Sequence, residues 1–221
     1  MSSWRSQRRI WDISQTLRPT NEKGGLPVWP GDTEFAFERT WTMGDGSPVN
    51  VGRMTLSTHS GTHGDAPLHY ADGAADIASL ALDPYIGECL VLDATRVTGG
   101  SISVGDLPHL DSADRVLFRT FESFPHEQWD STFTAIDAET IGWLALQGVK
   151  LVGTDAPSVD PQDSKTMEAH LAVLKHDMRI LEGLVLDDVP EGRYELIALP
   201  LKIAGGDAGL CRAILRELPD A

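Results

Sequence analysis

Three histidines and one aspartate fall within eleven residues, at positions His59, His63, Asp65 and His69. Glycines at 61 and 64 and a proline at 67 make a continuous helix costly there. A straight strand would instead leave His59 and Asp65 roughly 20 Å apart. We therefore expect the two glycines to let the chain fold back, so that imidazoles and carboxylate converge at a kinked strand end. Two imidazoles with a carboxylate suit zinc or a similar divalent ion, and a third imidazole could move protons. The pattern predicts a metal site with catalytic chemistry.

Other polar residues are less informative by spacing alone. His170 lies on an apolar helix face and is either a satisfied core histidine or a ligand, whereas the remaining histidines are interpreted as surface or capping residues: His109, His126 and His176. Several carboxylates stand near predicted strand ends, and spacing does not select among them: Asp93, Asp155, Glu182, Asp187 and Asp188. Trp29, between Pro27 and Pro30, either stacks on a flat substrate or packs its loop onto the core.

Composition excludes several classes of protein. The chain has 221 residues, with 18 Lys and Arg against 33 Asp and Glu and a formal net charge of −15, which disfavours nucleic-acid binding. No apolar run approaches the roughly 20 residues that a membrane span requires. The two cysteines, Cys89 and Cys211, form no paired-thiol motif, so a reducing cytoplasm is the expected compartment. Nucleophile-elbow, P-loop and dinucleotide-binding motifs are missing from the sequence.

The elements that must position these residues are mostly short strands. The length predicts one domain, over residues 10–221, behind a polar tail at 1–9. Strands are predicted at 34–43, 49–58, 89–94, 116–119, 149–154, 184–187 and 194–203. One helix is predicted from a capping Asp137 to Gly148, and a second from near Ser164 through His170. Because strands outnumber helices, the sequence predicts a mixed α+β domain with one large sheet system.

The segment from His59 to Tyr70 has the pattern His-x-Gly-Thr-His-x-Asp-x-Pro-x-His and resembles the hallmark of the metal-dependent cyclase family. The resemblance extends over nearly the whole chain from Ile10 onward and includes residues 11–14, 27–32, 127–130, 160–167, 181–190 and 194–202. It implies an α+β fold, a layered β/β/α (swivelling-domain-like) single domain with a mixed, strand-rich sheet system, and assembly as a homodimer. The Trp29 turn and the last two segments favour family members that act on aryl formamides. The implied reaction is zinc-dependent hydrolysis of N-formyl-L-kynurenine to L-kynurenine and formate in tryptophan degradation.

The same resemblance implies a metal-ligand set. His59, His63 and Asp65 would hold a first zinc, and Asp65 would bridge to a second zinc bound by His170. Glu182 would touch both metals. The implied cofactor is two zinc ions per subunit, although manganese or another divalent ion suits the same ligands.

Two further roles follow from the resemblance: His69 would be the proton donor and acceptor, and Trp29 would contact the substrate. The implied partners are a small-molecule aryl formamide and a second subunit, with no nucleic acid and no membrane. Two alternatives stay open at this point. One is a related amidohydrolase that acts on another amide or on a lactam such as isatin, and the other is a metal-binding protein without turnover.

Overall fold

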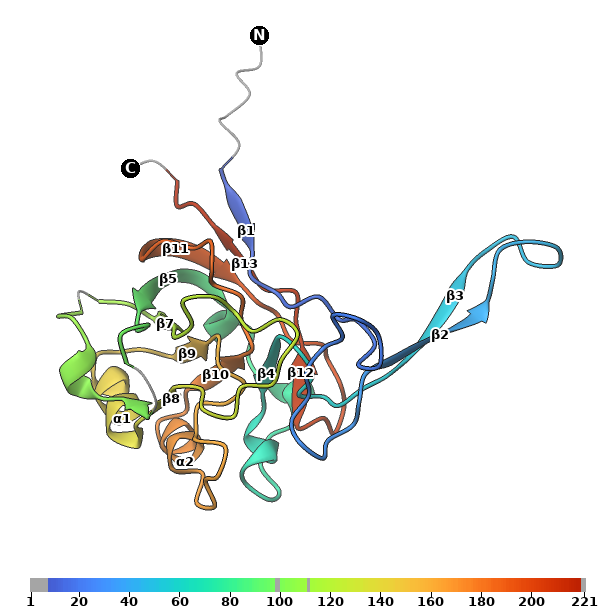
Figure 1. The fold of residues 1–221 in the computed structure, drawn as a ribbon. Coiled ribbons are helices and arrows are strands. Elements are labelled where there is room, and N and C mark those ends of the chain that lie inside the picture. Colours follow the sequence, from blue (N-terminus) through green and yellow to red (C-terminus); the bar gives the residue numbers. More distant parts are fainter. Residues whose placement is uncertain (1–7, 98–99, 111, 220–221) are drawn as a thin grey trace, which may run out of the picture.

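The computed structural model describes residues 8–97, 100–110 and 112–219 and is built around one large mixed sheet (Figure 1). This sheet has nine strands in the order β1-β13-β11-β5-β7-β9-β10-β4-β12. In chain order they are β1 (Ile10–Asp12), β4 (His63–Asp65), β5 (Ile86–Asp93), β7 (Arg115–Arg119), β9 (Leu151–Thr154), β10 (Arg179–Glu182), β11 (Gly192–Ile197), β12 (Ala208–Leu210) and β13 (Ile214–Arg216).

Smaller elements surround this sheet. Within the described ranges, strands β2 (Ala36–Trp41) and β3 (Val51–Thr55) pair only with each other, and β6 (Ser101–Ile102) pairs with β8 (Ala135–Ile136). The α-helices described are α1 (Ala138–Leu146) and α2 (Glu168–Lys175), and short 3₁₀ turns cover Pro67–His69, Ile77–Ser79, Asp83–Tyr85 and Val104–Asp106. The longest helix in the described ranges has nine residues, so none there could cross a membrane.

The central strands are buried on both faces. β5, β7, β9 and β10 run parallel to one another, whereas the outer neighbours β11 and β4 are antiparallel to them, and consecutive side chains point to opposite faces. Val116 and Phe118 therefore enter one apolar cluster, which includes Ile141 of α1 and Val173 of α2. Leu117 enters a second cluster with residues of β11 and β13. The sheet thus curls so that one face packs against helices and the other against its own outer strands.

The predicted α+β class, with a single strand-rich domain and few helices, is confirmed. Six of the seven predicted strands overlap strands of the structure, but the one at 184–187 is wrong. There the chain leaves the sheet at Gly183, which has a φ of +62°, and Leu184 and Leu186 fill the second cluster from a loop. A short apolar run indicates that residues are buried, and residues of a loop can be buried as well as those of a strand. The strand β10 lies just before this run. It was not predicted, because charged residues stand at both of its ends and leave only a short apolar stretch between them.

The first predicted helix is confirmed as α1, with Asp137 at the N-cap position and Gly148 just beyond its end at a φ of +91°. The second helix begins later than predicted, at Glu168. Met167 has a left-handed backbone, with a φ of 53°, and its N–H donates to the Ser164 hydroxyl at 3.1 Å. Residues from 164 to 167 therefore form a turn that leads into α2.

Residues 1–7 of the predicted tail lie outside the described residues. Arg8 and Arg9 are described and lie against the sheet edge: Arg8 pairs with Glu195 at 3.1 Å, and the Arg9 N–H donates to Glu217 at 2.8 Å. Both cysteines are free thiols.

Candidate metal centre and pocket

The histidine-rich segment reverses direction before it enters the sheet. Gly61 has a φ of +64°, a conformation that glycine adopts readily, and the chain then forms β4 between β10 and β12. The expected reversal therefore occurs at Gly61 alone. Gly64 lies within the strand, where a Cβ atom would approach Pro200 to 3.0 Å. Strand register places His63 directly opposite Glu182, with Asp65 two residues along on the same face.

The Asp65 carboxylate is the centre of the site. Its Oδ1 atom lies 3.2 Å from His59 Nδ1 and 3.4 Å from His63 Nε2, and its Oδ2 atom lies 3.3 Å from His170 Nε2. The residue is 1% exposed, and no well-aligned hydrogen-bond donor from the described residues reaches either oxygen. Burial raises the pKa of Asp65, but the surrounding imidazoles outweigh that effect and hold it well below its usual range. A buried carboxylate without aligned donors is suited to cations at both oxygens.

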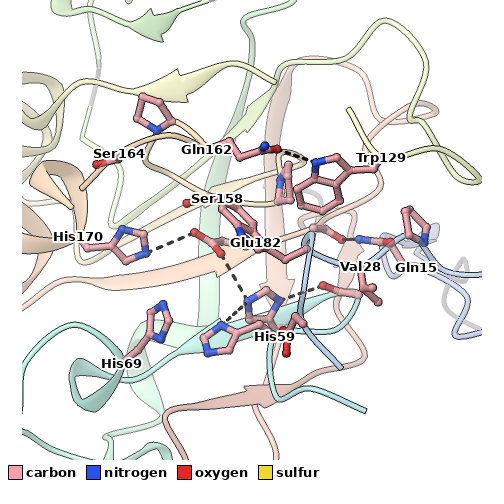
Figure 2. A pocket seen from close by; sticks show the side chains of 18 of the residues that line it. Gln15, Val28, His59, His69, Trp129, Ser158, Gln162, Ser164, His170 and Glu182 are labelled. Atoms are coloured by element: carbon pink, nitrogen blue, oxygen red, sulfur yellow. Dashed lines mark hydrogen bonds and ion pairs between the residues drawn. The ribbon is translucent and has the colours of Figure 1, made fainter. Parts of the chain in front are cut away.

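A second buried carboxylate, that of Glu182, lies between two of the same imidazoles, His63 and His170. One of its oxygens lies 3.5 Å from His63 Nε2, and the other lies 3.7 Å from His170 Nε2. The Val159 N–H donates to this second oxygen at 2.9 Å and fixes the carboxylate. In Figure 2 the Glu182 carboxylate points toward His170 across the floor of the cavity. Asp65 and Glu182 therefore each have one oxygen on the His63 side and one on the His170 side.

Each imidazole of the cluster is oriented by a partner on its far side. The His63 Nδ1 atom lies 2.9 Å from the Gly61 carbonyl oxygen, which leaves Nε2 to face the carboxylates. His170 Nδ1 lies 2.6 Å from Asp160, and His59 Nε2 lies 3.2 Å from Asp207. Outer partners of this kind set the tautomer and ring direction of metal-binding histidines.

The charge balance of the cluster also fits a divalent cation. Burial lowers the pKa of His63, but the contacts and charges of Asp65 and Glu182 outweigh it and raise that pKa to about 10. For His170, burial is likewise outweighed by Asp160 and Asp65, and the pKa rises to about 10. Protons therefore hold the positions that a cation would take, and metal binding must displace them. The ligand atoms of His63, Asp65 and Glu182 lie within 4.8 Å of one another, as do those of His59, Asp65 and His69.

His69 lies at the edge of the cluster on the 3₁₀ turn Pro67–His69. Its ring centroid is 4.1 Å from that of His59, its Nδ1 atom is 3.8 Å from Asp207, and its side chain is 30% exposed. Burial lowers the pKa of His69, and together with the charges of His59 and His170 it outweighs the opposing charges of Asp65 and Glu182. The neutral ring is thus favoured near neutral pH, which allows it to accept a proton and return it.

An open pocket of about 330 Å³ stands above the cluster, and its far wall is aromatic. Trp29 packs edge-on against Trp129, with ring centroids 5.3 Å apart, and against Phe133 at 6.4 Å. The Trp129 indole N–H donates to Gln162 at 2.6 Å, the contact drawn at the top of Figure 2. Trp29 lines the pocket and packs its loop against neighbouring rings, and its contact with substrate stays a prediction.

The structure brings all the candidate site residues to one cavity: Trp29, His59, His63, His69, His170 and Glu182 line it, and Asp65 lies buried among the imidazoles. Sequence reasoning missed two carboxylates, Asp160 and Asp207. Asp160 also accepts hydrogen bonds from the N–H groups of Ala169 and His170, at 3.0 Å each, and so caps the start of α2. No sequence spacing indicates this, because ten residues separate Asp160 from His170.

Asp160→Asn is expected to weaken metal binding about 10–100-fold with little change in fold, because an amide keeps an acceptor for α2 but removes the charge behind His170. The measurement is metal affinity by competition with a chelator. The exposed Asp163→Asn is the matched control. Equal affinities in the two variants would contradict the role of Asp160.

Three of the other strand-end carboxylates make structural contacts. Asp155 accepts hydrogen bonds from Thr120 N and Phe121 N at 2.9 and 3.1 Å, and burial raises its pKa to about 6. Asp187 accepts a hydrogen bond from Phe124 N at 2.8 Å, and Asp93 pairs with Arg119. Of the strand-end carboxylates singled out by position, Glu182 is the one that lies in the cluster.

A curled, strand-rich sheet that carries buried histidines and carboxylates beneath an open pocket defines a metal-dependent enzyme of the hydrolase class. The chain belongs to the Cyclase family, described as "Putative cyclase", whose model matches residues 11–161. It is 77% identical over 221 residues to the kynurenine formamidase of Erythrobacter litoralis (strain HTCC2594), covering 100% of both chains. The predicted family membership is confirmed.

Solved structures agree with this assignment. One described as a potential metal-dependent hydrolase with cyclase activity aligns with a TM-score of 0.81 and 31% identity, covering 96% of this chain and 100% of its own. Isatin hydrolase A from Labrenzia aggregata aligns with a TM-score of 0.79 and 21% identity, covering 95% of this chain and 94% of its own. The second likeness concerns the fold alone.

Proposed function

We propose that this chain is an arylformamidase that hydrolyses N-formyl-L-kynurenine to L-kynurenine and formate in tryptophan degradation, in one hydrolase domain over residues 10–221. The observation that carries the proposal is the buried Asp65 carboxylate, which faces three imidazoles beneath an aromatic pocket. The 77% identical relative named kynurenine formamidase supports the choice of substrate.

The proposed cofactor is two zinc ions. His59, His63 and Asp65 would hold the first, His170 and Asp65 would hold the second, and Glu182 would contact both. The arrangement of the carboxylate oxygens supports this division, because each carboxylate has one oxygen on the His63 side and the other on the His170 side. Bound zinc supplies a water molecule of lowered pKa and polarises the carbonyl group of the substrate.

The chain's own residues orient the substrate and move the proton. Trp29 holds the aryl ring against the aromatic wall, so that the formamide group points down to the cluster. Hydrolysis expels an arylamine, which needs a proton on its nitrogen as it leaves. His69, at the edge of the cluster, takes a proton from the attacking water and donates it to the amine nitrogen as the C–N bond breaks, since its lowered pKa keeps the ring neutral and able to accept that proton near neutral pH.

The direct test is release of kynurenine from N-formyl-L-kynurenine by protein reconstituted with zinc or with manganese. Isatin is assayed in parallel, because a lactam-hydrolysing relative is the alternative enzyme. Hydrolysis of isatin alone would replace the proposed substrate, and stoichiometric metal without turnover of either compound would favour a metal-binding protein.

The free thiols of Cys89 and Cys211 support a cytoplasmic location.

We propose a homodimer in which a hairpin arm, strands β2 and β3, packs on a second copy. The arm projects from the body in Figure 1, and its strands pair with no other described strand. Phe37 lies opposite Met54 on one face, and they are 43% and 58% exposed. The other face carries an ion pair between Glu38 and Arg53 at 2.7 Å. A two-stranded sheet is marginally stable by itself, so its apolar face requires a cover.

A second copy fits this surface in two respects. The apolar face bears the charge of Arg39, whose guanidinium lies 5.3 Å from the Phe37 ring, whereas the whole chain carries a formal net charge of −15. The body exposes Ile86 and Leu199; strand register pairs Ile86 with Ile197 at the end of β11, and Leu199 follows two residues later. A two-fold dimer would bury each arm on the body of the other copy, so the same arm-to-body contact would form twice and cover the apolar surfaces of both copies.

Met54→Glu is expected to convert the dimer to a monomer, because it places a charge in the apolar face of the arm. Thr55→Glu is the matched control, since the next residue of β3 points to the opposite face. The measurement is molar mass by light scattering across a range of concentrations. A dimeric Met54→Glu protein, or an equal effect of both substitutions, would contradict the proposed interface.

A further inference from the structure

Asp32 lies at the far end of the turn that carries Trp29. The Asp32 N–H donates to the Trp29 carbonyl oxygen at 2.9 Å, and Gly31 has a φ of +89°. Proline at the second position and glycine with a positive φ at the third are the features of a type II turn, which keeps its end residues within about 7 Å of each other. Trp29 and Asp32 therefore enter the same pocket from one short, rigid segment.

The Asp32 carboxylate is the charged group at this end of the pocket. Its Oδ1 atom accepts a hydrogen bond from Thr33 N at 2.6 Å, and no ion pair joins it to another described residue. Among the described lining residues, the other carboxylate is Glu182, which belongs to the metal cluster, and none is Lys or Arg. Away from the metal cluster, the described lining thus offers one free negative charge near the aromatic wall and no Lys or Arg side chain.

The substrate proposed above has a matching charge at the corresponding place. With its formamide at the cluster and its aryl ring on Trp29, the side chain next to the formamide extends away from the metals and ends in an α-ammonium and an α-carboxylate. We infer that Asp32 binds the primary ammonium group of the substrate, and that the pocket selects aryl formamides by this ammonium and not by the carboxylate. This inference rests on the proposed function for the pose of the substrate.

Three compounds separate the two charged groups. N-formyl-L-kynurenine has both, N-formylkynuramine has the ammonium but no carboxylate, and 2-formamidoacetophenone has neither. For the wild-type protein we expect similar KM values for the first two compounds and a KM about fivefold higher for the third. A fivefold change in affinity corresponds to the binding free energy of a solvent-accessible ion pair. In Asp32→Asn, which keeps an acceptor for Thr33 N, the three KM values should converge with little change in kcat. Glu34→Gln is the control, since Glu34 does not line the pocket.

Binding provides a readout that does not depend on turnover. Quenching of Trp fluorescence in the metal-loaded protein reports the affinity for the products kynuramine and 2-aminoacetophenone. Asp32→Asn should weaken binding of kynuramine about fivefold and leave binding of 2-aminoacetophenone unchanged. An equal effect on both ligands, or none on either, would overturn the inference. Failure to hydrolyse any of the three formamides would overturn the proposed function instead, and the binding measurement would still decide the role of Asp32.

Discussion

Asp65→Ala is expected to lose both metal ions and all measurable hydrolysis. Its two oxygens face different imidazoles, His59 and His63 on one side and His170 on the other, so one substitution removes a ligand from both positions. Removal of an outer partner of a metal ligand already costs about 10–100-fold in affinity, and removal of a shared ligand should cost more than about 100-fold. Metal content after dialysis, by elemental analysis, is the measurement.

Thermal unfolding with and without added zinc shows whether the Asp65→Ala protein is folded. Wild-type protein should gain stability from zinc by mass action, whereas the variant should unfold at the same temperature in both conditions. Asp72→Ala is the matched control, because Asp72 is an exposed carboxylate in the loop that follows His69. Full metal occupancy in a folded Asp65→Ala protein would refute the bridging role.

His69→Asn is expected to retain metal and to lose turnover, with kcat reduced about 10²–10⁴-fold, the usual contribution of a positioned proton carrier. Asparagine offers hydrogen bonds of similar reach but does not exchange a proton near neutral pH. The pH dependence of the residual activity should also lose the limb that reports His69. Steady-state kinetics and metal analysis on the same preparation are the measurements.

The second measurement matters because His69 lies close enough to His59 and Asp65 to be a ligand itself. If His69→Asn loses metal along with activity, His69 is a ligand and another group must move the proton. If kcat is unchanged, the proton-transfer role is wrong. His176→Asn, at the distant end of α2, is the control for loss of an imidazole elsewhere.

Much of the fold was predictable because its signals are local. Helix α1 is bounded by Asp137 and Gly148, and short apolar runs between Gly, Asp and Pro correspond to β5, β7 and β9. The prediction at 184–187 failed because Leu184 and Leu186 are buried from a loop. β10 was missed because Arg179 and Glu182 stand at its ends, and the structure buries both of these charged residues.

The residues of the candidate site fall into two groups: those that sequence spacing indicated and those that it did not. Spacing in the sequence by itself determined that His59, His63, Asp65 and His69 form one group, because glycines and a proline leave the segment unable to be a helix or a straight strand. Resemblance to a family added His170 and Glu182. Both lie more than one hundred residues further along the chain than His63, so spacing carried no information about them.

Only the tertiary structure decided how these groups face one another. The antiparallel register of β4 and β10 places His63 opposite Glu182, and the Asp160 carboxylate at the start of α2 turns His170 toward Asp65. The physical reason is that hydrogen-bond register and long-range polar contacts form between segments distant in sequence. The composition and spacing of either segment define the chemistry that is available, and the packing of the curled sheet defines which atoms meet.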